Sequence, residues 1–260
     1  MSRFGAMVLS AILAATAAPA SAGDPVKDIA FPGGSERALL ITPGQPKATL
    51  ILFPGGDGVI GLGSDGSIAT GSNFLVRSRR HWGELGFAVL LPDVPSGQSG
   101  LMGQRLTDSY AAAVSALVGF AKQQSAAPVW LIGTSQGTNA VVNAASRMTH
   151  REIAGIVLTS TLTEPGTGSM LRETVFGAKL AAIDVPVLIV SHSEDACKLS
   201  PPTDDARVKA ALTGAPQAEI TTESGGKPAD SDACGAKSAH GFYGIEGETI
   251  RQIADWIAAH

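Results

Sequence analysis

Short apolar runs that alternate with helix-like segments constrain the fold of this chain more than any other feature of its sequence. Each run is continuous rather than alternating and is rich in Val, Ile and Leu, which is typical of parallel strands that are buried on both faces. The runs occupy residues 48–53, 87–91, 129–132, 153–158 and 185–190.

The segments between the runs have helical spacing. Residues 106–122 begin with Thr107 and Asp108 as candidate capping residues, and residues 245–259 place apolar side chains along one face. Strands and helices in alternation indicate βαβ units, so we expect a parallel sheet with helices on both faces.

Two other segments complete the expected fold. Residues 29–31 and 38–42 are expected to form an antiparallel pair around Pro32-Gly33-Gly34. One helix near residues 171–182 is the only element expected between the last two runs. That segment leaves little room for a lid, so we expect an open site.

The N-terminus has the pattern of a secretory signal peptide. Arg3 precedes an apolar stretch over residues 6–18, and the small residues Ala20-Ser21-Ala22 follow. A membrane span needs about 20 apolar residues, more than this stretch offers. We therefore expect cleavage after Ala22, export to the periplasm or medium without stable membrane insertion, and a single domain over residues 23–260.

The charge balance is mildly acidic. Removing residues 1–22 removes Arg3 and no acidic residue, so the formal net charge moves from −4 to −5. Nucleic-acid partners require clustered basic residues, so none is expected. Arg77, Arg79 and Arg80 form the one basic cluster, and we interpret it as the solvated face of a helix.

A candidate nucleophile lies directly after the run 129–132. The segment Gly133-Thr134-Ser135-Gln136-Gly137 precedes a helix-like segment over residues 138–148. A serine on a sharp strand-to-helix turn needs glycine two positions before and two after it, because side chains there would collide. The alternative is a glycine-rich turn with a surface serine.

In this context the sequence resembles the α/β-hydrolase superfamily over nearly all of residues 23–260. That family places a nucleophile, an acid and a histidine in this order along the chain, and Ser135, Asp195 and His240 follow it. The resemblance implies a mostly parallel central sheet with helices on both faces and a minimal lid. Residues 238–242 resemble the family's histidine loop, which makes His240 the expected base for the Ser135 hydroxyl.

The acid is expected a few residues beyond the run 185–190. Asp195 fits that spacing best, with Glu194 as the rival and Glu164 as a more distant one. His192 and Glu194 could also suggest a metal site, but they lack a third ligand at a recognisable spacing. No metal and no cofactor are expected.

The negative charge that develops on an attacked carbonyl oxygen needs preorganised donors. One is expected to be the backbone N–H of Gln136, and the other the backbone N–H of Gly56, with Asp57 as second choice. The loop departs from the family's common His-Gly-Gly start, because Pro54 stands where histidine is often found.

Cys197 and Cys234 are the only two cysteines. An even pair in an exported protein is usually bonded, so a disulfide is expected, with two free thiols as the alternative. This bond would tie the segment carrying Asp195 to the segment carrying His240.

Together these features predict a serine hydrolase that acts on small-molecule carboxylic esters. Thioesters and amides are the next expected substrates. Two alternatives come from other classes. One is a catalytically silent binding protein, and the other is a cell-envelope interaction protein that presents a surface loop such as residues 61–73.

Overall fold

The computed structural model describes residue 1 and residues 25–167 and 172–260 of the chain. The expected signal peptide, residues 1–22, lies outside the described residues apart from Met1, so export stays a prediction. Within the described ranges no helix is long and apolar enough to cross a membrane.

One eight-stranded sheet forms the centre of the molecule, with the strand order β1-β2-β4-β3-β5-β6-β7-β8. Strand β2 pairs antiparallel with both β1 and β4, and the neighbours from β4 to β8 pair in parallel. The strands are β1 Val26–Phe31, β2 Gly34–Ile41, β3 Thr49–Phe53, β4 Ala88–Pro95, β5 Val129–Thr134, β6 Gly155–Thr159, β7 Val187–His192 and β8 Ala218–Glu223.

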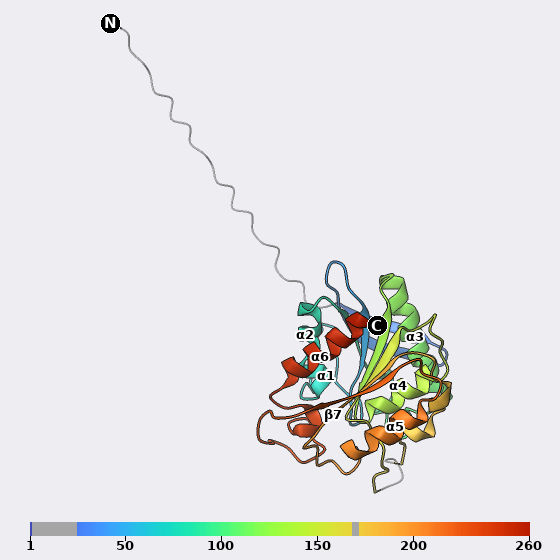
Figure 1. Ribbon diagram of the computed structural model, residues 1–260. Helices are drawn as coiled ribbons and strands as arrows, with labels where there is room; N and C mark the ends of the chain where they lie inside the picture. The colour runs from blue at the N-terminus through green and yellow to red at the C-terminus, as the bar shows by residue number, and fades with distance from the viewer. Residues whose placement is uncertain (2–24, 168–171) are drawn as a thin grey trace.

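Helices cover both faces of this sheet (Figure 1). One core cluster joins α3, α4 and α5 to one face, and a second joins α1, α2 and α6 to the other. Each buried central strand contributes side chains to both clusters, which explains why its sequence is continuously apolar. The helices are α1 Phe74–Arg77, α2 Arg79–Glu84, α3 Asp108–Gln124, α4 Gly137–Ala145, α5 Asp205–Ala211 and α6 Glu246–Ala259.

Most of the expected elements are present. The five apolar runs form β3 to β7, and the antiparallel pair around Gly33 forms β1 and β2. Thr107 caps α3, because its hydroxyl oxygen accepts a hydrogen bond from the Tyr110 N–H. Strand β4 extends beyond the apolar run, through Pro92 and Asp93 to Pro95.

The prediction of a helix over residues 171–182 was wrong. Two short 3₁₀ turns, Val175–Gly177 and Leu180–Ala182, occupy this segment, and Leu171 lies outside the described residues. Buried Val175 and Leu180 fix the turns to the core, and Gly177 is a poor helix former between them.

Two elements were missed. Strand β8 lies at the sheet edge and is half exposed, so its sequence AEITTE lacks a continuous apolar run. Helix α5 is short, and the residues it buries are Asp205 and Val208, so only one of them is apolar.

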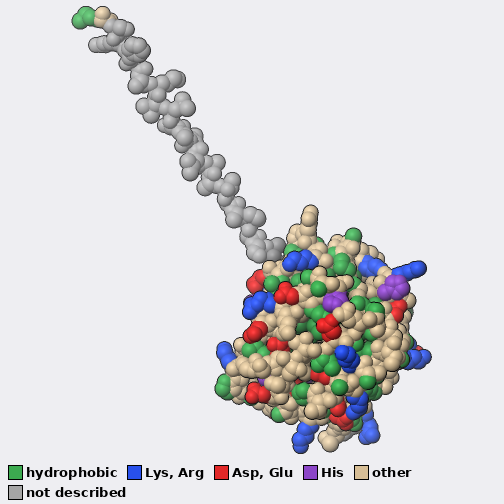
Figure 2. Space-filling model, viewed as in Figure 1, with side chains coloured by type: hydrophobic (Ala, Val, Ile, Leu, Met, Phe, Trp, Pro, Cys, Tyr) green, Lys and Arg blue, Asp and Glu red, His purple; other side chains and the backbone are tan. Residues whose placement is uncertain are grey.

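On the face shown in Figure 2, acidic and basic side chains are interspersed.

The parallel order brings the carboxyl ends of neighbouring strands to one edge of the sheet. The segments that follow β3, β5, β6 and β7 begin there, and they carry the loop 54–58, Ser135, Ser160 and Asp195. In open α/β sheets this edge is where ligands bind.

Candidate active site

Ser135 stands on the sharp bend between β5 and α4. Its φ of 53° lies in the left-handed region, which a non-glycine residue adopts only when the surroundings enforce it. The Ser135 N–H donates to the Thr159 carbonyl at 3.0 Å, and the Thr138 hydroxyl donates to the Ser135 carbonyl at 2.6 Å. These bonds hold the bend.

The glycines around the bend are required by close backbone approach. A Cβ on Gly137 would lie 2.0 Å from the Phe53 carbonyl oxygen, and one on Gly133 would lie 2.6 Å from the Gly137 carbonyl oxygen. Neither contact could be relieved by a side-chain rotation. The strand-to-helix turn therefore has the form that its sequence predicts.

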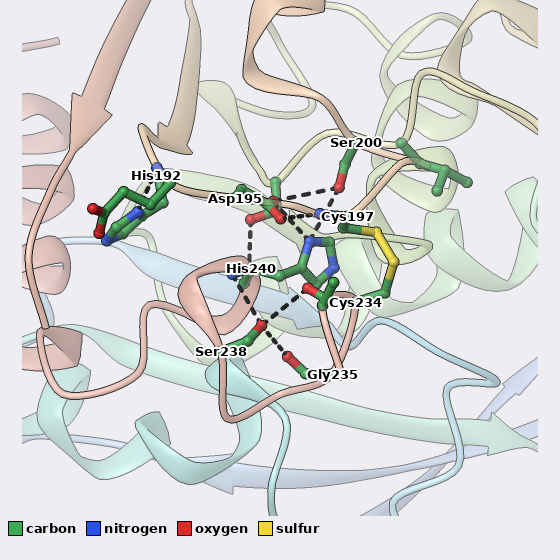
Figure 3. Close-up of polar contacts among 12 residues, drawn as sticks. His192, Asp195, Cys197, Ser200, Cys234, Gly235, Ser238 and His240 are labelled. Carbon is green, nitrogen blue, oxygen red and sulfur yellow. Dashed lines mark hydrogen bonds and ion pairs between the residues drawn. A yellow bond between two sulfur atoms is a disulfide. The ribbon is translucent and has the colours of Figure 1, made fainter. Parts of the chain in front are cut away.

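His240 lies in a 3₁₀ turn, Ala239–Gly241, just before α6. Its Nδ1 atom contacts the Asp195 Oδ2 atom at 2.9 Å, and both side chains are buried, 5% and 0% exposed (Figure 3). The Ser160 hydroxyl donates to the His240 carbonyl at 2.7 Å and so fixes the backbone at this histidine.

Asp195 follows β7, and each of its carboxylate oxygens has a donor besides the ring. The Cys197 N–H donates to Oδ1 at 2.9 Å, and the Ser200 hydroxyl lies 3.5 Å from Oδ2. Of the rival acids, Glu194 is exposed and Glu164 pairs with Arg207. The structure thus brings Asp195, rather than either rival, to the His240 ring.

Ser200 is a member of this cluster that the sequence did not single out. Its hydroxyl oxygen lies 3.0 Å from His240 Nδ1, on the same side of the ring as Asp195 (Figure 3). It is only 2% exposed and is not among the residues that line the pocket described below. Its place suits it to hold the ring rather than to attack a substrate.

The expected disulfide joins Cys197 to Cys234, with their Cα atoms 4.6 Å apart. Cys197 lies two residues after Asp195, and Cys234 lies six before His240. The bond therefore ties the acid segment to the histidine segment beside the His240 ring (Figure 3).

Ser135 and His240 both line one pocket of about 200 Å³. The His240 Nε2 atom is buried and has no hydrogen-bond partner among the described residues. Since Nδ1 is held by Asp195, Nε2 is the ring nitrogen left for a reacting group. The lining also includes Gly55, Gly56, Asp57, Val59, Ile60, Thr70, Ser72, Asn73, Phe74, Cys234 and Gly241.

Of the two expected oxyanion residues, Gly56 is among those that line this pocket, whereas Gln136 follows Ser135 and is not among them. Gly56 has a φ of 62°, and Gln136 is buried at the start of α4. The Asp57 carboxylate accepts from the Val59 N–H at 3.0 Å, which keeps that charge within its own loop. Behind the loop, buried Arg105 donates to the Pro54 carbonyl at 3.3 Å, a support that sequence reasoning missed.

Arg77 corrects the interpretation of the basic cluster as a solvated face. Its side chain is only 20% exposed and pairs with Glu246 of α6 at 2.8 Å. It also donates to the carbonyls of Ser72 and Gly241. Arg77 thereby joins the segment before α1 to the segment after His240, two sides of the pocket. Its neighbour Arg79 donates to the Val76 carbonyl.

No group of three or more metal-ligating side chains lies close together in the described ranges. Both ring nitrogens of His192 contact the backbone, Nε2 with the Gly225 carbonyl and Nδ1 with the Glu194 N–H.

No family model matches the chain, and no curated protein is similar to it in sequence. Solved structures share its architecture. A predicted CIB-like hydrolase from Thermoplasma acidophilum has a TM-score of 0.60 at 15% identity, over 92% of this chain and 99% of its own.

Two further structures are similar over comparable lengths. An α/β serine hydrolase without lid from Xanthomonas campestris has a TM-score of 0.59 at 14% identity, covering 89% of this chain and 95% of its own. A cold-adapted esterase from an Arctic intertidal metagenomic library has a TM-score of 0.58 at 15% identity, covering 88% and 92%. At such identities the structural likeness establishes the architecture alone. The architecture of this chain is the α/β-hydrolase fold, with a minimal lid.

Proposed function

We propose that this protein is a serine hydrolase that cleaves carboxylic esters, with Ser135 as nucleophile, His240 as base and Asp195 as the supporting acid. One observation carries the proposal: His240 lines the same pocket as Ser135, its Nδ1 atom contacts Asp195, and its Nε2 atom has no hydrogen-bond partner among the described residues. A serine hydroxyl needs such a base, because it is almost fully protonated at neutral pH.

The reaction proceeds by acyl transfer. His240 Nε2 takes the proton of the Ser135 hydroxyl as the serine oxygen bonds to the ester carbon, and the carbonyl oxygen becomes negatively charged. The C–O bond to the alcohol then breaks, and the alcohol leaves with the proton from Nε2. Asp195 keeps the other ring nitrogen protonated and stabilises the imidazolium.

Water completes the cycle. His240 takes a proton from a water molecule that attacks the acyl-serine, and Ser135 recovers its proton as the carboxylic acid leaves. The backbone N–H groups of Gln136 and Gly56 are the proposed donors to the charged oxygen in both steps. Each step uses only groups of the chain and water.

Esters are favoured over amides and thioesters as substrates. The similar esterase from the Arctic library supports that chemistry for this fold, and the cavity of about 200 Å³ suits a small acyl group. Thr70, Ser72 and Asn73 line it beside Val59 and Phe74, so the pocket is not uniformly apolar.

A panel of p-nitrophenyl esters of increasing chain length tests the proposal. Wild type should hydrolyse the short members, and Ser135→Ala should lower kcat by at least about 1,000-fold without unfolding the protein. A fluorophosphonate probe should label Ser135, as located by peptide mass spectrometry.

Ser72→Ala is the matched control, because Ser72 lines the same pocket and contacts Arg77 through its backbone carbonyl, which the substitution keeps. This variant should keep both activity and labelling. Labelling at Ser200, or equal hydrolysis by wild type and Ser135→Ala, would contradict the assignment. A folded protein that neither labels nor hydrolyses any ester would instead be a silent binding protein.

We also propose that the protein is exported after removal of residues 1–22. The N-terminal pattern supports this, as does the Cys197–Cys234 disulfide, a bond typical of oxidising compartments.

A further inference from the structure

Asn73 stands at the start of α1 and lines the pocket beside Ser135. Its Oδ1 atom accepts a hydrogen bond from the Leu75 N–H at 3.0 Å. Because an N–H donor requires an oxygen acceptor, that contact assigns the oxygen and nitrogen positions of the side-chain amide. The Nδ2 group therefore points away from the helix.

The Nδ2 group lies near Gly55. A Cβ on Gly55 would lie 2.9 Å from the Ser135 Cβ atom and 3.4 Å from Asn73 Nδ2. The amide nitrogen and the nucleophilic residue thus both lie close to Gly55. A side chain at position 55 would collide with Ser135 and with the Thr134 carbonyl oxygen.

The Nδ2 group donates to no acceptor among the described residues. Asn73 is partly buried, so a bound substrate that displaced water would leave this donor without a partner unless the substrate supplied one. An oxygen atom of the reacting ester is the acceptor that would lie nearest to Ser135.

The segment that carries Asn73 is held rigidly. Arg77 donates to the Ser72 carbonyl at 2.7 Å and to the Gly241 carbonyl beside His240, while it pairs with Glu246. Asn73 and His240 are thereby positioned by one guanidinium. Such preorganisation is what an electrostatic role in catalysis requires.

We propose that the Asn73 side-chain amide donates a hydrogen bond to the carbonyl oxygen of the ester as that oxygen becomes charged, as a third donor beside the N–H groups of Gly56 and Gln136. The inference rests on the proposed hydrolase function. It makes Asn73 a catalytic residue that acts mainly on kcat, because the bond strengthens as the charge develops.

Two substitutions separate this role from helix capping. Serine and aspartate both cap helices well, so Asn73→Ser and Asn73→Asp should keep the thermal stability of wild type. Asn73→Ser loses the donor and should lower kcat by about 100-fold. Asn73→Asp places a negative charge at the same point and should lower kcat further, although it is the stronger cap.

The measurement is kcat and KM for the same p-nitrophenyl esters, with Thr107→Ser as the control, because it changes a capping side chain of α3 that does not line this pocket. An unchanged kcat in Asn73→Ser, or a loss confined to KM, would overturn the inference while Ser135→Ala still abolished activity. Wild type that neither hydrolyses esters nor reacts with the fluorophosphonate probe would instead refute the hydrolase function itself.

Discussion

Two carboxyl groups are buried equally deeply in this protein, but their surroundings differ. Asp195 accepts hydrogen bonds from the Cys197 N–H and contacts the His240 ring at 2.9 Å. Glu36 of β2 has one long contact, 3.5 Å from the Tyr110 hydroxyl, and its Oε2 atom has no partner among the described residues. Both side chains are 0% exposed.

The comparison shows that donors, rather than burial, decide what a buried carboxyl group can do. Burial raises the pKa of Glu36 to about 8, and the nearby Asp93 charge adds to the rise, while the Tyr110 hydroxyl opposes it. At neutral pH Glu36 is therefore mostly protonated and serves as a neutral polar group in the core. Asp195 has the contacts that a carboxylate needs to support an imidazolium.

The largest effect should come from Asp195→Asn. The amide keeps the shape of the side chain but cannot hold the His240 ring in the tautomer that leaves Nε2 free to accept a proton. We expect kcat for short p-nitrophenyl esters to fall by about 10,000-fold.

Glu194→Gln is the control for this substitution, since it removes the neighbouring exposed carboxylate and should leave kcat unchanged. A comparable loss in Glu194→Gln, with activity retained in Asp195→Asn, would transfer the acid role to Glu194.

A smaller effect should follow from removing the disulfide that holds the Asp195 segment to the His240 segment. Replacing Cys197 and Cys234 together by alanine opens a loop with a sequence separation of 37 residues. The chain-entropy relation predicts a loss of about 4 kcal/mol in the free energy of unfolding. Urea denaturation of wild type and variant measures this difference.

Activity should also fall in the double variant, because small displacements between catalytic groups are costly. A thiol reductant offers an internal control. It should lower the stability and activity of wild type and leave those of the double variant unchanged. Equal unfolding midpoints for the two proteins would show that the bond constrains nothing.

Sequence reasoning located the residues that carry local signals. Ser135 stood between two glycines after an apolar run, and Asp195 and His240 followed it in the family's order. The geometry of the Ser135 bend and the Asp195–His240 contact agree with those predictions. Their catalytic roles stay proposals.

The residues that sequence reasoning missed act through contacts between distant segments. Ser200 reaches His240 across 40 residues, and Arg77 reaches Gly241 across 164. No local pattern marks such pairs, and a charged run that includes Arg77 looks like a solvated helix face. Asn73 carried a weak signal, since asparagine before an apolar stretch is typical of a helix start.

The smallest effect on activity should come from Glu36→Gln, which completes the comparison. Glutamine keeps a contact for the Tyr110 hydroxyl and cannot ionise, so kcat at pH 7 should stay within about twofold of wild type. Its effect should appear instead in how stability depends on pH.

The sign follows from the raised pKa. Between the ordinary value of 4.5 and the folded value of about 8, the unfolded chain releases a proton that folded Glu36 retains. Wild type should therefore lose free energy of unfolding as pH rises through this window, by about 1.4 kcal/mol for each pH unit over which only the folded state keeps the proton. Below pH 4.5 the stabilisation is fully present. Glu36→Gln should remove this slope, whereas Glu194→Gln should keep it. Urea denaturation of the three proteins between pH 5 and 9 measures this dependence. Parallel curves for wild type and Glu36→Gln would mean that Glu36 is ionised in the folded protein.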